Sequence, residues 1–171
     1  MGWIKENINL MSKEEILYDT DDIQRDSEGN YLIDIAYRRV STEKQSLDGF
    51  GLDSQLEKIK ACCRKNDSTA CILITDDGFT GTNFNRPGFK EMLNDIDSGI
   101  IDTIVVKDLS RFGRNHLEVG TYLDEIFLIN NIRFIAIDDN YDNKGLMDEF
   151  STFKNIFNEM YLKDLRKKIK S

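Results

Sequence analysis

Residues 33–45 read Ile-Asp-Ile-Ala-Tyr-Arg-Arg-Val-Ser-Thr-Glu-Lys-Gln, an apolar, strand-forming run that ends in a polar turn. In an open parallel sheet, side chains at the carboxyl end of a strand face the crevice in which ligands bind. The hydroxyl of Ser41 then lies beside the guanidinium of Arg39, a suitable position for a nucleophile directed at a phosphate. An ordinary strand followed by a Ser/Thr turn explains the same residues equally well, so the rest of the chain has to decide.

Strand-like and helix-like segments alternate after this stretch. The expected strands cover residues 31–40, 71–75, 103–106 and 133–137, and the expected helices cover residues 53–65, 87–97 and about 116–128. Asp53 is the expected N-cap of the first helix, and Pro87 occupies a favourable first-turn position in the second. Such alternation predicts an α/β fold, a three-layer domain with a mainly parallel central sheet of about four to five strands and helices on both faces. The inward face of the third helix is expected to comprise Leu117, Tyr122, Leu123, Ile126 and Phe127.

The two terminal segments differ from this core, which we expect over residues 31–146. Residues 1–30 form an acidic extension without expected chemistry, and a capping box of Ser12 and Glu15 favours a short helix over Ser12–Tyr18. Over residues 147–171, apolar and aromatic residues recur at three- and four-residue steps, which predicts a long C-terminal helix. Its last third is basic, as expected of a helix that projects toward another chain or DNA.

Composition limits the possible function classes. The chain has 171 residues, enough for one α/β domain with a substantial core. It has no apolar run of membrane-spanning length and no secretory signal pattern, so we expect a cytoplasmic protein. Three cysteines give neither a disulfide framework nor a zinc spacing. The net charge of −8 argues against a self-sufficient nucleic-acid binder, although bases concentrate at Arg38–Arg39, Arg111–Arg114 and residues 163–170.

Arginines dominate the expected strand ends. Arg39, Arg86, Arg111 and Arg114 would share one edge of the sheet with Ser41. Planar guanidiniums match phosphoryl oxygens in bidentate geometry, and fixed positive groups stabilise the charge that develops during attack on a phosphodiester. A neighbouring carboxylate, Asp76 or Asp77, could shuttle a proton or hold an arginine in place.

Three motifs in order along the chain resemble those of the serine site-specific recombinases, the resolvase–invertase family. The first is Tyr-x-Arg-Val-Ser-Thr-x-x-Gln at residues 37–45. The second is Asp-x-Gly-x-Thr-Gly-Thr-Asn-Phe-x-Arg-Pro-Gly-Phe at residues 76–89, and the third is Lys-Asp-Leu-Ser-Arg-Phe-Gly-Arg-Asn at residues 107–115. With the last helix, the resemblance covers the chain from about Leu32 to its end.

The resemblance implies a specific mechanism and specific partners. Ser41 would attack DNA and form a covalent 5′-phosphoserine linkage, with no metal and no high-energy cofactor. Arg39, Arg111 and Arg114 would grip the scissile phosphate, Arg86 would assist from a mobile loop, and Tyr37, Gln45 and Asp76 would complete the hydrogen bonding. The C-terminal helix would begin the helix through which family members form dimers and reach double-stranded DNA, and four subunits would make up the active complex.

Some residues depart from the family pattern. Ser110 stands where small resolvases usually carry Asp, and Ser110, the lengthened loop over residues 46–55 and residues 83–89 look more like the large serine recombinases, the integrases and transposases of mobile elements. Arg38 stands where a small residue is usual. The chain also ends inside the basic helix, without the DNA-binding part that follows in the family, so we expect a catalytic domain with weak sequence-specific DNA binding.

Two other function classes stay open from the sequence. In a metal-dependent nuclease, Asp76, Asp77, Asp138 and Asp139 would hold Mg²⁺ through their oxygens. In a non-catalytic phosphate-binding dimerisation module, the arginines would recognise a ligand, although no P-loop or dinucleotide glycine pattern follows any strand. A hydrolase triad with His116 lacks the Gly-x-Ser-x-Gly elbow.

Overall fold

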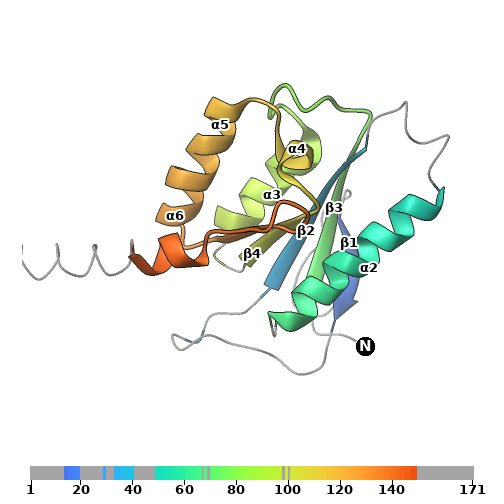
Figure 1. Ribbon diagram of the computed structural model, residues 1–171, viewed down its shortest axis with the longest axis horizontal. Helices are drawn as coiled ribbons and strands as arrows, with labels where there is room; N and C mark the ends of the chain where they lie inside the picture. Colours follow the sequence, from blue (N-terminus) through green and yellow to red (C-terminus); the bar gives the residue numbers. More distant parts are fainter. Residues whose placement is uncertain are drawn as a thin grey trace, which may run out of the picture.

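A six-stranded sheet forms the centre of the protein in the computed structural model (Figure 1). The structure describes residues 14–19, 29, 33–40, 49–66, 68, 70–97, 99 and 101–149. For residues 14–19 and 49–55 it describes the backbone alone. The strands are β1 (Glu14–Asp19), β2 (Ile33–Val40), β3 (Ala70–Asp77), β4 (Ile101–Val106), β5 (Arg133–Ala136) and β6 (Tyr141–Asp142). The helices are α2 (Gly49–Lys65), α3 (Pro87–Asp97), α4 (Leu109–Phe112), α5 (His116–Gly120), the π-helical turn η1 (Thr121–Ile126) and α6 (Phe127–Ile129), and residues 144–149 are also helical.

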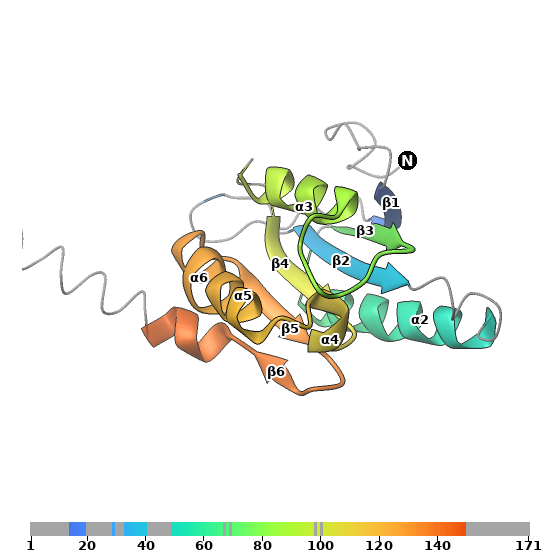
Figure 2. The same ribbon diagram turned by 90° about the horizontal axis from the view of Figure 1, so that it is seen from above.

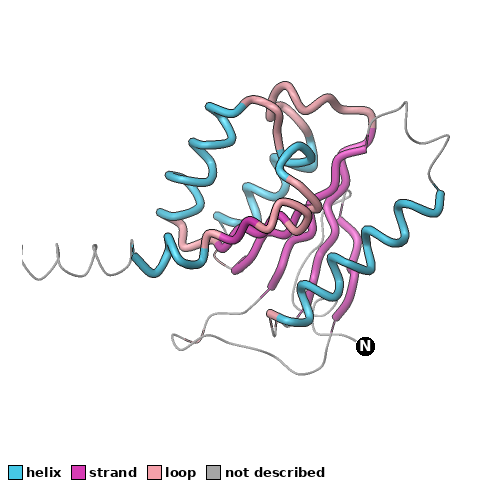
Figure 3. The backbone as a smooth tube through the Cα atoms, viewed as in Figure 1, coloured by secondary structure: helices cyan, strands magenta, loops and turns pink. Residues whose placement is uncertain are grey.

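The strand order is β1-β3-β2-β4-β5-β6. Neighbours among the four central strands pair in parallel, whereas β1 and β6 pair antiparallel at the two edges. The predicted α/β class and mainly parallel sheet are therefore confirmed, and the two antiparallel edge strands are additions to the predicted set. The loops after β3 and β4 lie at the same edge of the sheet, where the carboxyl ends of the parallel strands meet (Figure 3).

Helices cover both faces of the sheet, as predicted, with α2 on one side and α3 on the other (Figure 1 and Figure 2). The larger core lies between the sheet and α3, α5, η1 and α6, and it receives Ile33, Ile35 and Tyr37 from β2. The smaller core lies under α2, where Ile59 and Cys63 pack against the alternate side chains of the strands. Because successive strand residues point to opposite faces, the even-numbered residues of β2 face α2 and the odd-numbered ones face the larger core.

Helix α3 begins at Pro87, as its sequence predicts, and buries Phe89, Met92 and Ile96. Gly99 follows it with a φ of +73°, a conformation that glycine adopts without steric cost. Helix α2 begins at Gly49, four residues before the predicted N-cap Asp53, so a residue that favours a cap locally lies inside the helix.

The predicted helix over Ser12–Tyr18 is wrong, because Glu14–Asp19 forms strand β1. Without β1, the backbone of β3 would have an unpaired edge, and pairing with it satisfies the N–H and C=O groups of both strands. An isolated helix of seven residues has no comparable source of stability in water. The pairing register of β1 with β3 shifts between Ile16 and Tyr18.

The expected single helix over residues 116–128 is divided by the π-helical turn η1. Hydrogen bonds in a π-helix span five residues instead of four, so the side chains before and after the turn differ in phase. Leu117 is therefore 85% exposed, which corrects its assignment to the inward face, and Val119 is buried in its place. Leu123 and Phe127 are buried as expected.

Two elements after β4 and β5 were not predicted. Helix α4 interrupts the expected loop over residues 107–115, and β6 returns antiparallel to β5 within the expected loop over residues 138–145. Asn143 is fully buried behind this hairpin, where its Oδ1 accepts a 2.7 Å hydrogen bond from the N–H of Phe134. Of the predicted C-terminal helix, residues 147–149 are helical and residues 150–171 lie outside the described residues. Within the described ranges, every helix is too short or too polar to cross a membrane.

Candidate active site

The candidate site lies where β2, β3 and β4 end. Tyr37 and Arg39 lie near the carboxyl end of strand β2, on the face of the larger core. Asp76 of β3 is the register partner of Arg39. The predicted nucleophile Ser41 and its neighbour Gln45 lie outside the described residues. The described part of the site is therefore the arginines, Tyr37 and Asp76 that surround the end of β2.

A buried hydrogen-bond network joins three of the predicted site residues. The Tyr37 hydroxyl donates to Asp76 Oδ2 over 2.7 Å and accepts from Arg86 Nη1 over 2.7 Å. Asp76 also accepts the N–H groups of Gly88 at 2.8 Å and Phe89 at 3.0 Å, so its carboxylate anchors the first turn of α3. Burial, together with the hydrogen bond to Asp76, raises the pKa of Tyr37 well above its ordinary value, so the phenol remains a hydrogen-bond donor.

Arg86 is enclosed by the protein, with 1% of its surface exposed. Its guanidinium lies 4.9 Å from the ring centre of Phe84 and 5.2 Å from that of Phe89. Its Nη2 donates to the carbonyl oxygen of Phe112 over 2.6 Å. Arg86 thereby ties the loop after β3 to the end of α4, and this position differs from the exposed one that a phosphate-gripping residue on a mobile loop would have.

Arg39 connects the two loops of the site. Its Nη1 donates to the carbonyl oxygen of Phe79, and its Nη2 donates to that of Ser110, over 3.0 and 3.1 Å. Both partners are neutral, and among the residues that the structure describes no carboxylate accepts a hydrogen bond from Arg39. The guanidinium is thus oriented by backbone carbonyls, with 2% of the residue exposed.

Helix α4 positions the remaining arginines. Asp108 caps this helix by accepting the N–H of Arg111 at 3.1 Å, and its carboxylate lies 3.8 Å from the Nε of Arg111. The hydroxyl of Ser110 also donates to Asp108. Arg114 follows the helix, is exposed, and donates its backbone N–H to the carbonyl oxygen of Gly81 over 2.8 Å.

Gly81 separates two of the arginines. A Cβ atom at this position would lie 2.9 Å from Cγ of Arg114 and 3.2 Å from Nη2 of Arg39. The two arginine side chains, which come from β2 and from the segment after α4, therefore approach the same backbone position. Only a residue without a side chain allows both to remain there.

Positive charge accumulates at this edge of the sheet. Burial lowers the pKa of Arg39, and the charges of Arg114, Arg111 and Arg86 lower it further, in that order. Such mutual repulsion has to be offset when the site is empty, and it is relieved when an anion binds. The predicted convergence of four arginines on one edge is thus present in the described residues.

The aspartates proposed as magnesium ligands lie apart and have other partners. Asp138 lies between Lys58 at 3.6 Å and Lys107 at 3.8 Å, and Asp139 accepts the N–H of Leu109 over 2.7 Å. In the part of the chain that the structure describes, no group of three or more His, Cys, Asp or Glu side chains could hold a metal ion. His116 is exposed at the start of α5. This geometry favours anion binding by the arginines over cation binding by the aspartates.

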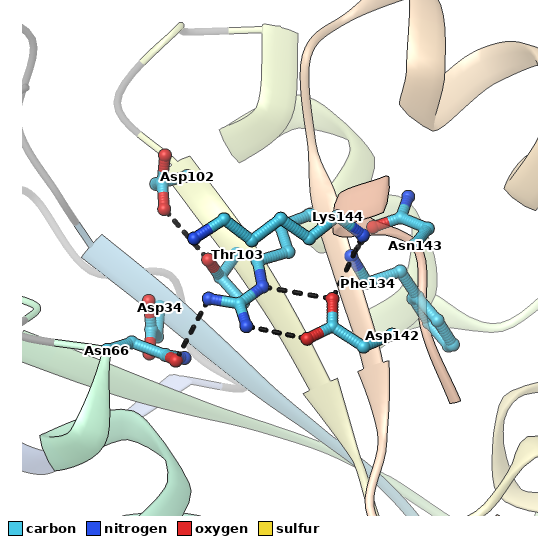
Figure 4. A network of polar contacts seen from close by, with 9 residues as sticks. Asp34, Asn66, Asp102, Thr103, Phe134, Asp142, Asn143 and Lys144 are labelled. Atoms are coloured by element: carbon cyan, nitrogen blue, oxygen red, sulfur yellow. Dashed lines mark hydrogen bonds and ion pairs between the residues drawn. The ribbon is translucent and has the colours of Figure 1, made fainter. Parts of the chain in front are cut away.

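A second polar network, on the α2 face, was not predicted (Figure 4). Asp34 of β2 is fully buried and accepts a hydrogen bond from Asn66 Nδ2 over 3.3 Å, while Asn66 Oδ1 accepts from Arg133 over 3.1 Å. Arg133 in turn forms a bidentate pair with Asp142 at 3.1 and 2.6 Å. Burial raises the pKa of Asp34 to about 7. A carboxylate between two isoleucines of a buried strand was the sequence signal for this network.

Comparisons with known proteins agree with this geometry. The family model "Resolvase, N terminal domain" matches residues 34–171. The chain is 31% identical over 116 residues to the serine recombinase gin of Escherichia phage Mu, covering 68% of this chain and 52% of that protein. A Bacillus subtilis protein whose name assigns it to the DNA recombinases is 29% identical over 128 residues, covering 69% of this chain and 25% of that protein.

Solved structures give the same result. The N-terminal catalytic domain of TP901-1 integrase superposes with a TM-score of 0.59 at 25% identity, and the match covers 75% of this chain and 98% of that domain. The chain spans about half the length of the phage Mu recombinase and a quarter of the Bacillus subtilis protein.

Proposed function

Because this chain belongs to the family of the resolvase N-terminal domain, the catalytic domain of serine recombinases, we propose that it contains the DNA-cleaving site of a site-specific recombinase. The observation that carries the proposal is the approach of Arg39 Nη2 and of the Arg114 side chain to the same position at Gly81, next to the strand end that leads to Ser41. The charges of Arg114 and Arg111 act on Arg39 and lower its pKa, and a group of arginines that interact in this way favours an anionic ligand with several oxygens, such as a backbone phosphate.

In the proposed reaction, the Oγ of Ser41 attacks the scissile phosphorus. A bond forms between this oxygen and phosphorus as the Ser41 hydroxyl loses its proton, the bond from phosphorus to the 3′ oxygen breaks, and the 3′ oxygen takes up one proton, so the numbers of protons and bonds balance. The product is a 5′-phosphoserine linkage, which retains the energy of the phosphodiester. Rejoining reverses the same step on an exchanged 3′ end, so recombination requires no nucleotide cofactor.

The described residues have two kinds of role in this proposal. Arg111 and Arg114 contact the scissile phosphate and stabilise the charge that develops on its oxygens. Arg39 joins them when a hydrogen bond from its Nη1 or Nη2 moves from the carbonyl of Phe79 or Ser110 to the phosphate. Arg86, Tyr37 and Asp76 act as positioning residues, because their polar groups are buried and occupied by one another and by the backbone of α3 and α4.

We also propose the wider assembly that the sequence implies. Residues 147–171 would begin the helix that joins two subunits and approaches DNA, and four subunits would exchange strands at two sites. The features shared with large serine recombinases, Ser110 among them, favour an integrase or transposase of a mobile element. In the structure, the carbonyl oxygen of Ser110 orients Arg39, and its side chain bonds to Asp108.

A covalent adduct tests the proposed function. The full-length protein is incubated in EDTA with DNA from the ends of its element, and the products are examined on denaturing gels and by peptide mass spectrometry. We expect an adduct on Ser41 that disappears in Ser41→Ala and persists in the control Ser110→Ala, which keeps the carbonyl that binds Arg39. Nicking that requires a divalent metal and leaves no adduct would overturn the proposal in favour of a nuclease.

A further inference from the structure

Arg38 is the residue of β2 that departs from the family pattern, and it lies on the opposite face of the strand from Arg39. Its register partner on β3 is Thr75, and its Nη2 donates to Oγ1 of Thr75 over 3.2 Å. The side chain is half-buried at the carboxyl edge of the sheet, on the face that α2 covers. Arg38 and Arg39 thus present charge on the two faces of one strand end.

Two lysines lie on the α2 side of the sheet, as Arg38 does. Ala36 pairs with Val105, and Arg38 and Lys107 each follow two residues later along the chain, so the alternation of side chains predicts that both lie on the α2 face. Lys107 and Lys58 of α2 both lie near the carboxylate of Asp138, at 3.8 and 3.6 Å. We call Arg38, Lys58 and Lys107 the α2-face basic cluster.

The charges of this cluster are only partly neutralised. Asp138 is shared by the two lysines, and among the described residues no carboxylate pairs with Arg38, whose buried Nε has no hydrogen-bond partner. Arg133, on the same face of the sheet, forms two hydrogen bonds with Asp142. A half-buried guanidinium held by one neutral hydroxyl is costly for the protein unless an anion completes it.

We propose that the α2-face basic cluster binds a second backbone phosphate of the DNA strand, with Arg38 as its main contact. This inference rests on the proposed function, because the strand that enters the Arg39 site has to cross the carboxyl edge of the sheet. Arg38 then contacts the strand from the α2 side while Arg39, Arg111 and Arg114 contact the scissile phosphate. The lysines add charge around this second phosphate without fixed geometry.

Salt-dependent DNA binding tests the inference without knowledge of the target site. The affinity of the chain for a short duplex is measured by fluorescence anisotropy across a salt series for wild type, Arg38→Gln, Arg38→Lys and Lys107→Gln. The matched control is Lys90→Gln, which removes one exposed positive charge on α3, on the other face of the sheet. Thermal unfolding of each variant reports whether the fold is retained.

One phosphate contact contributes about 0.9 to the slope of log affinity against log salt. Between about 50 and 200 mM salt, the affinity of Arg38→Gln should therefore fall about three- to fourfold less than that of wild type. We expect a smaller change in slope for Lys107→Gln, a slope near wild type for Arg38→Lys, and no effect of Lys90→Gln.

The possible failures are distinct. If wild type binds DNA and Arg38→Gln weakens it equally at every salt concentration, or not at all, the second phosphate contact is overturned while the proposed function stands. If Arg38→Gln and Lys90→Gln change the slope equally, general charge explains the result and the inference also fails. If wild type shows no salt-dependent DNA binding even at low salt, the second phosphate contact is overturned, and the adduct on Ser41 decides the proposed function separately.

Discussion

The buried carboxyl of Asp34 should make the stability of this protein depend strongly on pH. The side chain is fully buried, with a hydrogen bond from Asn66 to one oxygen and no partner for the other among the described residues. Burial raises its pKa from the ordinary 3.8 to about 7, and the nearby charge of Asp102 adds to the effect. Because one pKa unit corresponds to about 1.4 kcal/mol, the charged form is disfavoured in the folded protein by about 4 kcal/mol.

The sign follows from proton uptake. Between pH 3.8 and about 7, the carboxyl is ionised in the unfolded chain and protonated in the folded one, so folding binds a proton. The contribution of Asp34 to stability is fully present below the lower value and is lost as pH rises through the higher one. Asp34→Asn retains an oxygen for Asn66 but has no charge, so it should become more stable than wild type as pH rises.

Urea denaturation at about pH 5 and about pH 8 measures this effect, and the free energy of unfolding of Asp34→Asn relative to wild type should rise by about 3 kcal/mol between them. Asn66→Ala, which removes the hydrogen bond that lowers the pKa of Asp34, should move the wild-type loss of stability to higher pH. An unchanged difference between Asp34→Asn and wild type at the two pH values would refute this account.

Two further predictions concern the site. Gly81→Ala should displace Arg39 and Arg114 and lower the rate of DNA cleavage about ten- to a hundredfold, with little loss of stability. Gly145→Ala is the control and should have no effect, because the space around Gly145 is open. Equal cleavage rates for the two variants would contradict the close approach of the arginines to Gly81. Tyr37→Phe should lower the free energy of unfolding by about 1–3 kcal/mol, because Arg86 and Asp76 lose a buried partner. Tyr122→Phe is the control, because the Tyr122 hydroxyl makes no hydrogen bond in the described part of the chain. If Tyr37→Phe loses DNA cleavage but keeps wild-type stability, the Tyr37 phenol acts in catalysis instead of positioning.

The sequence predicted the elements whose signal is local. The apolar runs of β3 and β4 and the Pro87 start of α3 suffice to place them, and the rule for parallel sheets brings their ends together. Strand β1 was missed because a capping pattern suggests a helix there, and only the distant β3 makes a strand the better state. Leu117 was misplaced because no periodicity rule foresees the phase change at a π-helical turn.

The structure brings together Tyr37, Asp76 and Arg86 of the predicted site, whereas Ser41 and Gln45 lie outside the described residues. The rule for parallel sheets places Asp76 and Arg86 at the edge where β2 ends, and the family resemblance adds Tyr37 to the site. Neither predicts that Arg86 is enclosed by aromatic rings and unavailable to solvent. Phe84 and Phe89 lie two and three residues from it, so a local aromatic signal was present. The steric role of Gly81 depends on two arginines far apart in the chain and could not be read from the sequence.

The pairing of β1 with β3 bears on where this domain can be separated from the rest of its chain. The family match begins at residue 34, and β1 ends at Asp19, before that boundary. A fragment cut at the family boundary would leave the N–H and C=O groups along one side of β3 facing water. Exposed edges of this kind recruit strands from other molecules and lead to aggregation. Homology alone would suggest that β1 is dispensable, but β1 covers the edge of the sheet at β3. The folding unit of this protein therefore begins before residue 34, where the family match begins.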